Sequence, residues 1–255
     1  MLNKKDEPKN INENQLEGRN AVLELLKSGK DVDKIIVAKG NVEGTIKRII
    51  GEASRKGIVI QEVARQKLDE ISQTKNHQGV IAIASAHSYA TVEEILENAA
   101  SKNEPPFIII LDGITDPHNL GAIMRTAECA GAHGIIIPKR RSVGLTAVVG
   151  KTSAGAIEYM PVAKVTNISN TIEELKEKGV WIASTDMDGE TYFNADLKGP
   201  IAIVIGAEGD GVSRLVKEKC DFNVSIPMYG NISSLNASVA AGLIMYEIVR
   251  KRKFL

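Results

Sequence analysis

Polar residues in this chain gather in three segments, and each segment follows an apolar run. The first contains Asn119 and Arg125 and comes after the run 107–111. The second is the glycine-rich stretch 206–211, and the third is the loop 226–236, which leads into a helix of small residues. Open α/β sheets place their ligand crevice at the carboxyl ends of the strands. We therefore expect the three segments to form one ligand-binding site.

The residue types in these segments suit a polar ligand that is held close to the backbone. Closely spaced glycines let backbone N–H groups approach a ligand without interference from a Cβ atom. Arg125 lies among small residues, where a long cation needs a partner. Asn119, Ser234 and Asn236 could contact a ligand, and each could instead cap a helix.

The spacing does not support several other kinds of site. Gly144 and Gly150 are separated by five residues, whereas the phosphate-binding P-loop requires four. The glycines of 206–211 do not fit the G-x-G-x-x-G pattern of nicotinamide-dependent oxidoreductases. The histidines and cysteines have no metal-ligand spacing, so no metal site is predicted, and the G-x-S-x-G elbow of a hydrolase is absent.

The first third of the chain alternates helices and strands, which is enough for one small α/β domain. Residues 1–12 are polar and are predicted to be a flexible tail. Apolar spacing predicts helices at 14–28, 42–53 and 65–72, and short apolar runs predict strands at 34–38, 58–63 and 80–84. A capping box at Thr91 and Glu94 predicts a short acidic helix, and Pro105-Pro106 marks the best domain boundary.

The remainder of the chain predicts a doubly wound, mostly parallel sheet. The run 107–111 is apolar at every position, as in strands that are buried on both faces. Further strands are predicted at 134–137, 180–184, 201–205 and 222–226, with helices at 120–130, 171–178, 213–219 and 236–252. Thr171 and Glu174 are predicted to form the capping box of their helix.

The composition limits the class of protein. The 255 residues include 32 basic and 32 acidic side chains, with 43% hydrophobic and 25% charged residues, which excludes a disordered chain. No apolar run approaches the roughly 20 residues of a membrane-spanning helix, and two cysteines make no disulfide framework. These features favour a cytoplasmic protein. A nucleic acid would have to meet local basic clusters, which occur at 139–141, at 250–253 and at Lys47/Arg48 with Arg55/Lys56.

Taken together, the three polar segments resemble the SpoU class of RNA ribose 2′-O-methyltransferases in the SPOUT superfamily, the TrmH/RlmB-like rRNA methyltransferases. The matching residues are Asn119-x-Gly-Ala-x-x-Arg125-Thr-Ala, Gly206-x-Glu208-Gly209, Ile226-Pro-Met228 and Ser234-Leu235-Asn236-x-Ser. Residues 151–156 also fit. In the N-terminal half, 17–22 and 76–80 resemble the L30e-like RNA-binding domain of the RlmB subgroup. The resemblance covers residues 14–255.

The resemblance implies a C-terminal SPOUT-type α/β domain with a deep trefoil knot that binds S-adenosylmethionine. It implies that backbone groups of Gly206, Ile226 and Leu235 hold this cofactor and that the loops ending in Gly209 and Met228 enclose it. Arg125 would then act on the ribose hydroxyl. Asn119, Ser234 and Asn236 would position the reacting groups, and Glu208 would order the cofactor loop.

The resemblance further implies four regions: a tail at 1–12, an L30e-like RNA-binding domain at 13–88 with Arg19 and Asn20 as RNA contacts, a linker at 89–105, and a methyltransferase domain at 106–255. Family members form homodimers through the C-terminal domain. The implied substrate is a guanosine of 23S ribosomal RNA. Transfer RNA, an antibiotic-resistance target in ribosomal RNA and a catalytically silent RNA-binding or ribosome-assembly role remain the alternatives.

Overall fold

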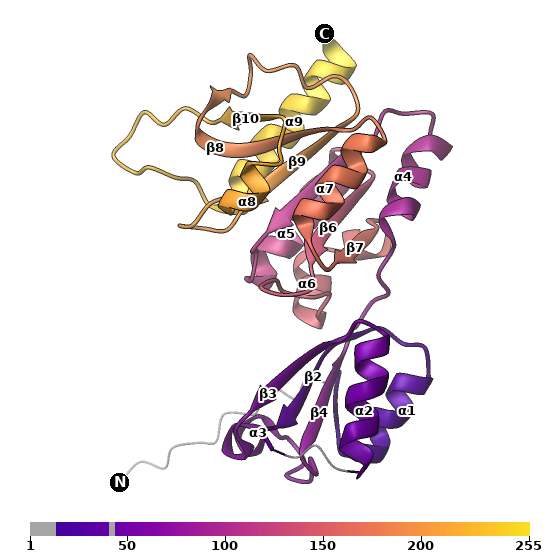
Figure 1. The fold of residues 1–255 in the computed structure, drawn as a ribbon. Coiled ribbons are helices and arrows are strands. Elements are labelled where there is room, and N and C mark those ends of the chain that lie inside the picture. The colour runs from indigo at the N-terminus through magenta and orange to yellow at the C-terminus, as the bar shows by residue number, and fades with distance from the viewer. Residues whose placement is uncertain (1–13, 41–43) are drawn as a thin grey trace. The chain divides into compact units, whose positions relative to one another are not determined.

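The structure, a computed structural model, describes residues 14–40 and 44–255 and divides into two compact units, Met1–Ala86 and His87–Leu255 (Figure 1). The predicted tail and the first residues of the predicted helix 42–53 lie outside the described residues. In the described part of the chain, no helix is both long and apolar enough to cross a membrane.

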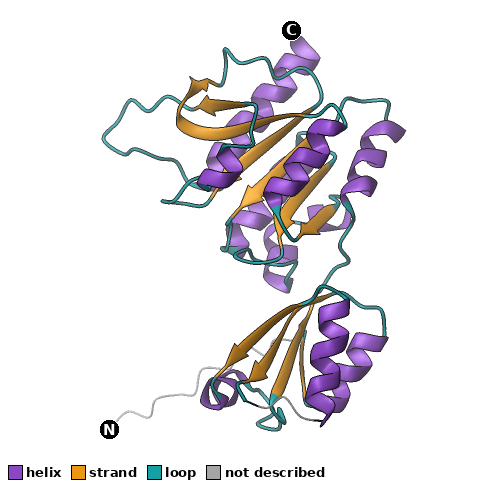
Figure 2. Ribbon diagram, viewed as in Figure 1, coloured by secondary structure: helices purple, strands orange, loops and turns teal. Residues whose placement is uncertain are grey.

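The N-terminal unit is a four-stranded sheet with helices on both faces (Figure 2). Its strands lie in the order β1 (Gln15–Glu17), β4 (Val80–Ala84), β2 (Val32–Ala38), β3 (Val59–Val63), and only β2 and β3 are parallel. One face packs against α1 (Arg19–Lys27) and α2 (Gly44–Arg55), and the other against α3 (Arg65–Ile71). The predicted strands and helices of this unit are therefore present.

The first predicted helix begins later than its apolar spacing indicates. Leu16 lies on β1, which pairs with β4 in antiparallel register, and α1 starts only at Arg19. Gly18 separates the two elements with a φ of 90°, a conformation that a helix cannot contain. Pairing with a strand more than 60 residues away outweighs the local helical pattern.

The C-terminal unit is built on a six-stranded sheet in the order β10-β8-β9-β5-β6-β7, and every neighbouring pair is parallel. This confirms the predicted α/β fold with a parallel sheet. Its strands are β5 (Phe107–Asp112), β6 (Gly134–Pro138), β7 (Val162–Val165), β8 (Trp181–Thr191), β9 (Ile201–Gly206) and β10 (Phe222–Ser225).

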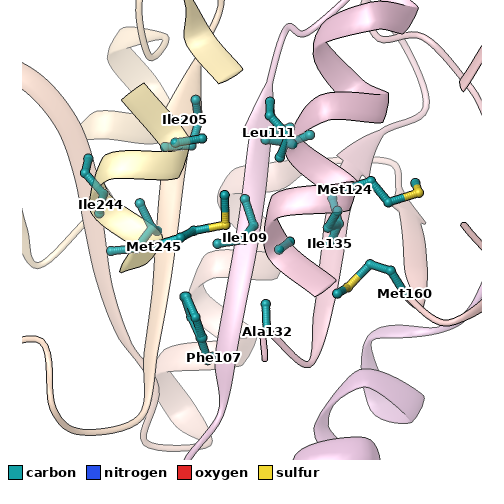
Figure 3. Close-up of a cluster of buried hydrophobic side chains, with 14 of the residues drawn as sticks. Phe107, Ile109, Leu111, Met124, Ala132, Ile135, Met160, Ile205, Ile244 and Met245 are labelled. Atoms are coloured by element: carbon teal, nitrogen blue, oxygen red, sulfur yellow. The ribbon is translucent and has the colours of Figure 1, made fainter. Parts of the chain in front are cut away.

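The central strand β5 is buried on both faces, as its unbroken apolar run predicts. Phe107, Ile109 and Leu111 belong to a core that also includes α5 (Pro117–Cys129), α6 (Ala147–Thr152), the 3-10 turn Ala156–Glu158 and α9 (Ala237–Phe254) (Figure 3). Ile108 and Ile110 point to the opposite face, which is covered by α4 (Val92–Ser101), α7 (Ile168–Glu177) and α8 (Arg214–Lys217).

The segment 89–105, expected as a linker, carries α4, and this helix packs into the C-terminal unit. The predicted capping box of Thr91 and Glu94 is present, and Ile95 is fully buried. The contact is close, because a Cβ atom on Gly134 would come within 2.4 Å of Ile95. The apolar side of α4 is covered by the sheet of the C-terminal unit, so this helix belongs to that unit. The two units accordingly divide before α4, between residues 86 and 87.

Two helix caps differ from the sequence prediction. Asp116, not Asn119, caps α5 by accepting a hydrogen bond from the His118 N–H at 2.9 Å. Asn167 caps α7, so that Thr171 lies inside the helix and forms no capping box. In both cases the cap lies three or four residues earlier, because the helix begins before its apolar pattern becomes visible.

Candidate functional site

Three residues from the three polar segments meet at the carboxyl edge of the sheet. The Asn119 amide donates to Glu208 Oε1 at 3.0 Å, and the Asn236 amide donates to Asn119 Oδ1 at 3.0 Å and also contacts Glu208 Oε1. Asn119 lies in the first turn of α5, Glu208 follows β9, and Asn236 precedes α9. Residues up to 117 positions apart thus form one hydrogen-bonded group.

Asn236 serves both roles that the sequence allowed. Its Oδ1 accepts from the N–H groups of Ser238 at 3.0 Å and Val239 at 3.4 Å, which caps α9. Its Nδ2 remains available for Asn119 and Glu208. The Ala237 N–H, in the first turn of α9, lies 3.4 Å from Glu208 Oε1. A negative carboxylate at the positive end of an 18-residue helix is electrostatically favourable.

A cavity of about 380 Å³, here called the inner cavity, lies beside this group. It is lined by Glu208 and Ser234. It is also lined by all five residues predicted to hold a cofactor, which are Gly206, Gly209, Ile226, Met228 and Leu235. Its wall includes apolar side chains and the carboxylates of Asp186 and Asp210. Its size is within the usual range for a small-molecule site.

Gly206 is essential to the shape of the inner cavity. A Cβ atom at this position would lie 2.0 Å from the backbone carbon of Gly211. The loop 206–211 folds back so tightly that only glycine fits at its start, and Gly209 and Gly211 adopt positive φ angles of 86° and 67°. The glycine-rich sequence therefore encodes the loop that forms one wall of the cavity.

A second cavity, of about 460 Å³ and here called the outer cavity, lies on the other side of the Glu208 loop. The two cavities share Ala207, Glu208, Asp210 and Gly211 as lining residues. Asn119 and two arginines, Arg140 and Arg141, also line the outer cavity. In the sequence these arginines stand out only as a basic cluster, and nothing in their spacing links them to the three polar segments.

Arg125 is not brought into this group. It is exposed on α5, lines neither cavity and has no ion-pair or hydrogen-bond partner among the described residues. Asn119 faces the site from the beginning of the same helix. Within one chain, the structure therefore assembles eight of the other catalytic and cofactor candidates around Glu208 and leaves the arginine outside.

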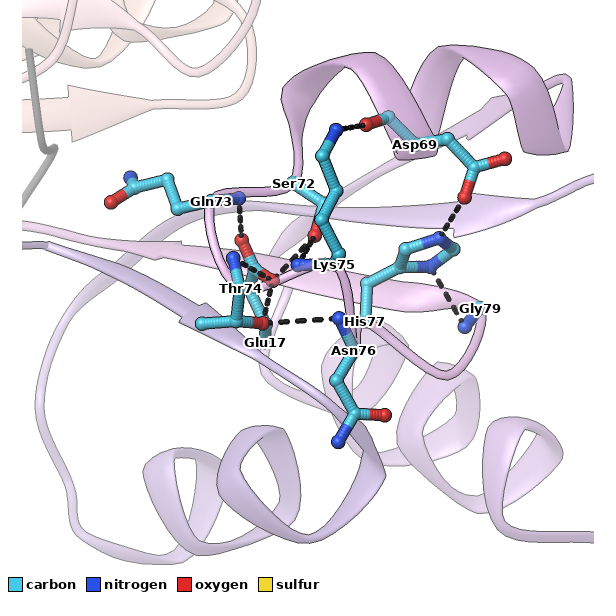
Figure 4. Close-up of polar contacts among 9 residues, drawn as sticks. All are labelled: Glu17, Asp69, Ser72, Gln73, Thr74, Lys75, Asn76, His77 and Gly79. Atoms are coloured by element: carbon cyan, nitrogen blue, oxygen red, sulfur yellow. Dashed lines mark hydrogen bonds and ion pairs between the residues drawn. The ribbon is translucent and has the colours of Figure 1, made fainter. Parts of the chain in front are cut away.

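The two N-terminal motifs also meet in space, because the Gly18 N–H donates to the Val80 carbonyl at 3.2 Å. Glu17, at the start of the first motif, binds the loop just before the second (Figure 4). Its carboxylate accepts from Gln73 N at 2.6 Å, Ser72 Oγ at 2.7 Å, and both the N–H and hydroxyl of Thr74. Burial by itself would raise the pKa of this carboxyl, but the hydrogen bonds, with Thr74 first among them, lower the pKa from 4.5 to about 2. Glu17 thereby fixes the loop that precedes the second motif.

The predicted RNA contacts lie at the same end of the N-terminal unit. The Arg19 N–H donates to Gln78 Oε1 and its Nε donates to the Gln78 carbonyl, both at 3.2 Å, while Asn20 is exposed. His77 is buried and bridges Asp69 at 2.8 Å and the Gly79 N–H at 3.0 Å. In the described ranges, no group of three or more His, Cys, Asp or Glu side chains could hold a metal ion.

Internal contacts engage the C-terminal basic cluster. Arg250 pairs with Glu247 at 2.7 Å, and Lys253 pairs with Glu104 at 3.2 Å. Arg252 donates to the carbonyls of Pro105, Pro106 and Gly199, and Lys251 donates to Ala195 O. Lys251, Arg252 and Lys253 thus hold the end of α9 against the segments that precede β5 and β9, whereas Arg250 pairs within its own helix.

Comparison with known proteins identifies relatives over nearly the whole chain. The profile of the SpoU rRNA Methylase family matches residues 106–246, and a profile described as RNA 2'-O ribose methyltransferase substrate binding matches residues 15–90. YacO of Bacillus subtilis, assigned to the TrmH family of tRNA/rRNA methyltransferases, is 54% identical over 236 residues, which are 92% of this chain and 94% of YacO.

A second relative agrees with this assignment, and a solved structure shares the fold. A Staphylococcus saprophyticus protein assigned to the same TrmH family is 47% identical over 93% of this chain and 96% of its own length. The fold is that of the SpoU methyltransferase AviRb of Streptomyces viridochromogenes, solved in complex with the cofactor AdoMet. The TM-score is 0.58 at 23% identity, with 93% of this chain and 89% of AviRb covered.

Proposed function

The chain belongs to the SpoU rRNA methylase family of RNA methyltransferases, and we propose that it transfers a methyl group from S-adenosylmethionine to the 2′-hydroxyl of a ribose in RNA. One observation carries this proposal. The Asn119–Glu208–Asn236 group stands between two cavities, so that a cofactor on one side and a nucleotide on the other would meet at its edge.

The inner cavity suits the cofactor. Its apolar residues, including Ile226 and Leu235, offer a surface for a nucleobase, and its Glu208 and Asp210 carboxylates can balance the positive charge of the sulfonium. The third carboxylate, Asp186, already pairs with Lys217 at 2.6 Å. Backbone groups at Gly206, Ile226 and Leu235 are proposed to bind the cofactor, with Gly209 and Met228 closing over it. The trefoil knot that the family resemblance implies is part of this proposal.

When bound, S-adenosylmethionine supplies a methyl group that is already activated on a sulfonium. The residues of the chain have to prepare the ribose hydroxyl, which is barely ionised at neutral pH. Arg125 stays charged under ordinary conditions. We assign it to orienting the hydroxyl and stabilising the alkoxide charge that develops, while the hydroxyl proton passes to solvent water. Asn119, Ser234 and Asn236 hold the ribose or its phosphate in place, and Glu208 orders the loop between the cavities.

A homodimer would explain how Arg125 reaches a site that it does not line in its own chain. Val239, Leu243 and Tyr246 on α9 are 51%, 40% and 51% exposed. Their spacing of four and three residues places them on one face of the helix. Helix α9 packs against α5, which carries Arg125. A second copy that covers this apolar face would bring its own α5 close to the first copy's cavities.

The N-terminal unit is proposed to bind the substrate RNA as an L30e-like domain spanning residues 13–88, with Arg19 and Asn20 as contacts. This rests on the substrate-binding profile that matches residues 15–90. We propose a guanosine of 23S ribosomal RNA as the target, which implies that the protein acts in the cytoplasm. Transfer RNA is the second candidate, because YacO is assigned to a family that covers both tRNA and rRNA.

The test is methyl transfer from labelled S-adenosylmethionine to unmodified ribosomal RNA and, separately, to unmodified transfer RNA. A ribose 2′-O-methyl group blocks alkaline cleavage at the adjacent phosphodiester, so one alkali-resistant position in ribosomal RNA is the expected result. Label in transfer RNA alone would change the substrate and keep the reaction. If neither RNA is labelled and the cofactor does not bind, the catalytically silent RNA-binding role replaces the proposal.

The same assay tests Arg125. We expect Arg125→Ala to reduce turnover by about 100-fold or more, because a positioned charge is lost at the reacting oxygen. Glu128→Ala, an exposed change one turn further along α5, is the matched control. Near-normal turnover of an Arg125→Ala variant that folds and binds cofactor would remove the arginine from the mechanism.

A further inference from the structure

The outer cavity carries two cations that the three polar segments do not explain. Arg140 and Arg141 line it, both are exposed, and neither guanidinium has an ion-pair partner among the described residues. The C-terminal basic cluster, by contrast, is held by internal partners. Of these two clusters, the arginines at 140 and 141 are the ones whose charge is available to a ligand at the site.

The loop that carries the arginines is anchored on several sides. Lys139 N–H donates to the Val165 carbonyl at 2.7 Å, and Val143 N–H donates to the Ile114 carbonyl at 3.0 Å. Leu145 is buried, and its N–H donates to the Tyr89 hydroxyl at 3.0 Å. The arginines therefore project from a loop that is hydrogen-bonded to Val165, Ile114 and Tyr89. A fixed loop loses little conformational entropy when its side chains bind a ligand.

Arg141 occupies a backbone position that disfavours it. Its φ is 58°, in the left-handed region where glycine or asparagine costs less than a residue with a long side chain. An arginine at such a position, with its side chain at a cavity, indicates that the side chain itself is needed there.

Four carboxylates line the outer cavity; Asp112, Asp116 and Glu208 accept hydrogen bonds, and Asp210 is exposed on the loop shared with the inner cavity. Asp112 accepts from the Ser213 N–H at 2.8 Å, Asp116 caps α5, and Glu208 accepts from the amides of Asn119 and Asn236. These hydrogen bonds partly offset the negative charge of the three carboxylates. A phosphate in the cavity would thus meet two guanidinium groups whose planar donors match its oxygens.

We propose that Arg140 and Arg141 bind the backbone phosphate next to the target ribose. The ribose would then lie against the Glu208 loop, which separates the outer cavity from the inner one. This rests on the proposed methyl transfer to RNA. The arginines act as positioning residues, because they hold the nucleotide and do not touch the reacting oxygen. The shared wall of the two cavities is what places a phosphate held here beside the bound cofactor.

The experiment compares the wild-type protein with Arg140→Gln/Arg141→Gln on the RNA that the wild type methylates. We expect the KM for RNA to rise by about 10- to 100-fold, with cofactor affinity unchanged, because charge-assisted hydrogen bonds to phosphate are lost. The slope of log Kd for RNA against log salt should fall by about 0.7 for each phosphate contact removed.

A control double variant removes the same charge elsewhere. Lys102→Gln/Lys178→Gln changes two exposed lysines at the ends of α4 and α7, at the opposite edge of the sheet. It should leave both the KM and the salt slope near the wild-type values. An equal loss in this control, or an unchanged KM and slope in the arginine variant, would overturn the proposal.

Arg141→Gly separates binding from folding. Glycine suits a φ of 58°, so this variant should unfold at the same temperature or higher while its KM for RNA rises by about 10-fold. A lower unfolding temperature with an unchanged KM would assign Arg141 a purely structural role. The salt dependence of the Kd for RNA is measured without turnover. A wild-type protein that binds RNA but transfers no methyl group would therefore refute the proposed function, while the salt slope would still test the arginines.

Discussion

Each unit of the molecule has a glutamate that accepts several hydrogen bonds, and the two are used differently. The donors to Glu17 come mainly from a single loop, residues 72–74. The donors to Glu208 come from two distant segments, and its carboxylate is exposed between two cavities. Glu17 therefore closes a loop within its own unit. Glu208 joins three chain segments where a ligand can reach them.

The largest effect is expected at Glu208. Replacing it with alanine removes the acceptor for Asn119, Asn236 and the Ala237 N–H, and each lost hydrogen bond costs about 1 kcal/mol. We expect kcat/KM to fall by about 100-fold, with weaker cofactor binding measured by calorimetry. Glu128→Ala is the control. A normal kcat/KM in Glu208→Ala would show that Glu208, like Glu17, takes no part in the chemistry.

Glu17→Gln should affect stability instead of chemistry. The lowering of its pKa to about 2 corresponds to at most about 3 kcal/mol, and partial exposure reduces the expected loss in unfolding free energy to about 1–2 kcal/mol. The measurement is chemical denaturation of the full chain. Glu24→Gln, which breaks an exposed ion pair with Lys27, should change the free energy by less than about 0.5 kcal/mol. A fall in kcat at saturating RNA would contradict the structural role.

The two units should also weaken at different pH. Burial lowers the folded-state pKa of His133 below 6.5, so its contribution to the C-terminal unit is present above about pH 6.5 and is lost as the pH falls. The contribution of Glu17 is present above about pH 4.5 and is lost towards pH 2. Hydrogen exchange resolved by unit should show the C-terminal unit weakening first.

The matched variant for this effect is His133→Gln. The Phe107 N–H donates to His133 Nδ1 at 3.0 Å, and the glutamine side-chain oxygen can replace that acceptor. It should flatten the pH dependence of the C-terminal unit just below pH 6.5. If the variant and the wild type have the same profile, a group other than His133 is responsible.

Local patterns predicted most of the elements in this chain. The apolar run of β5 and the capping box of α4 have the predicted positions. The errors occurred where a distant partner outweighed the local pattern. Leu16 pairs with β4, and β8 continues to Thr191 because β10 lies beside it as far as Ser225. That α4 packs into the C-terminal unit could not be seen from Pro105-Pro106, because a buried helix face leaves no mark on the prolines that follow it.

By itself, the sequence determined which residues could do chemistry, because motif residues such as Glu208 and Asn236 stand at fixed positions after apolar strands. The tertiary structure decided which of them meet. It joined Asn119 to Glu208 and Asn236, it left Arg125 exposed, and it placed Arg140 and Arg141 at the same edge. Spacing along a chain specifies strands and helices, but contacts between loops depend on the order of strands in the sheet. That order is set by packing between segments that lie far apart in the sequence.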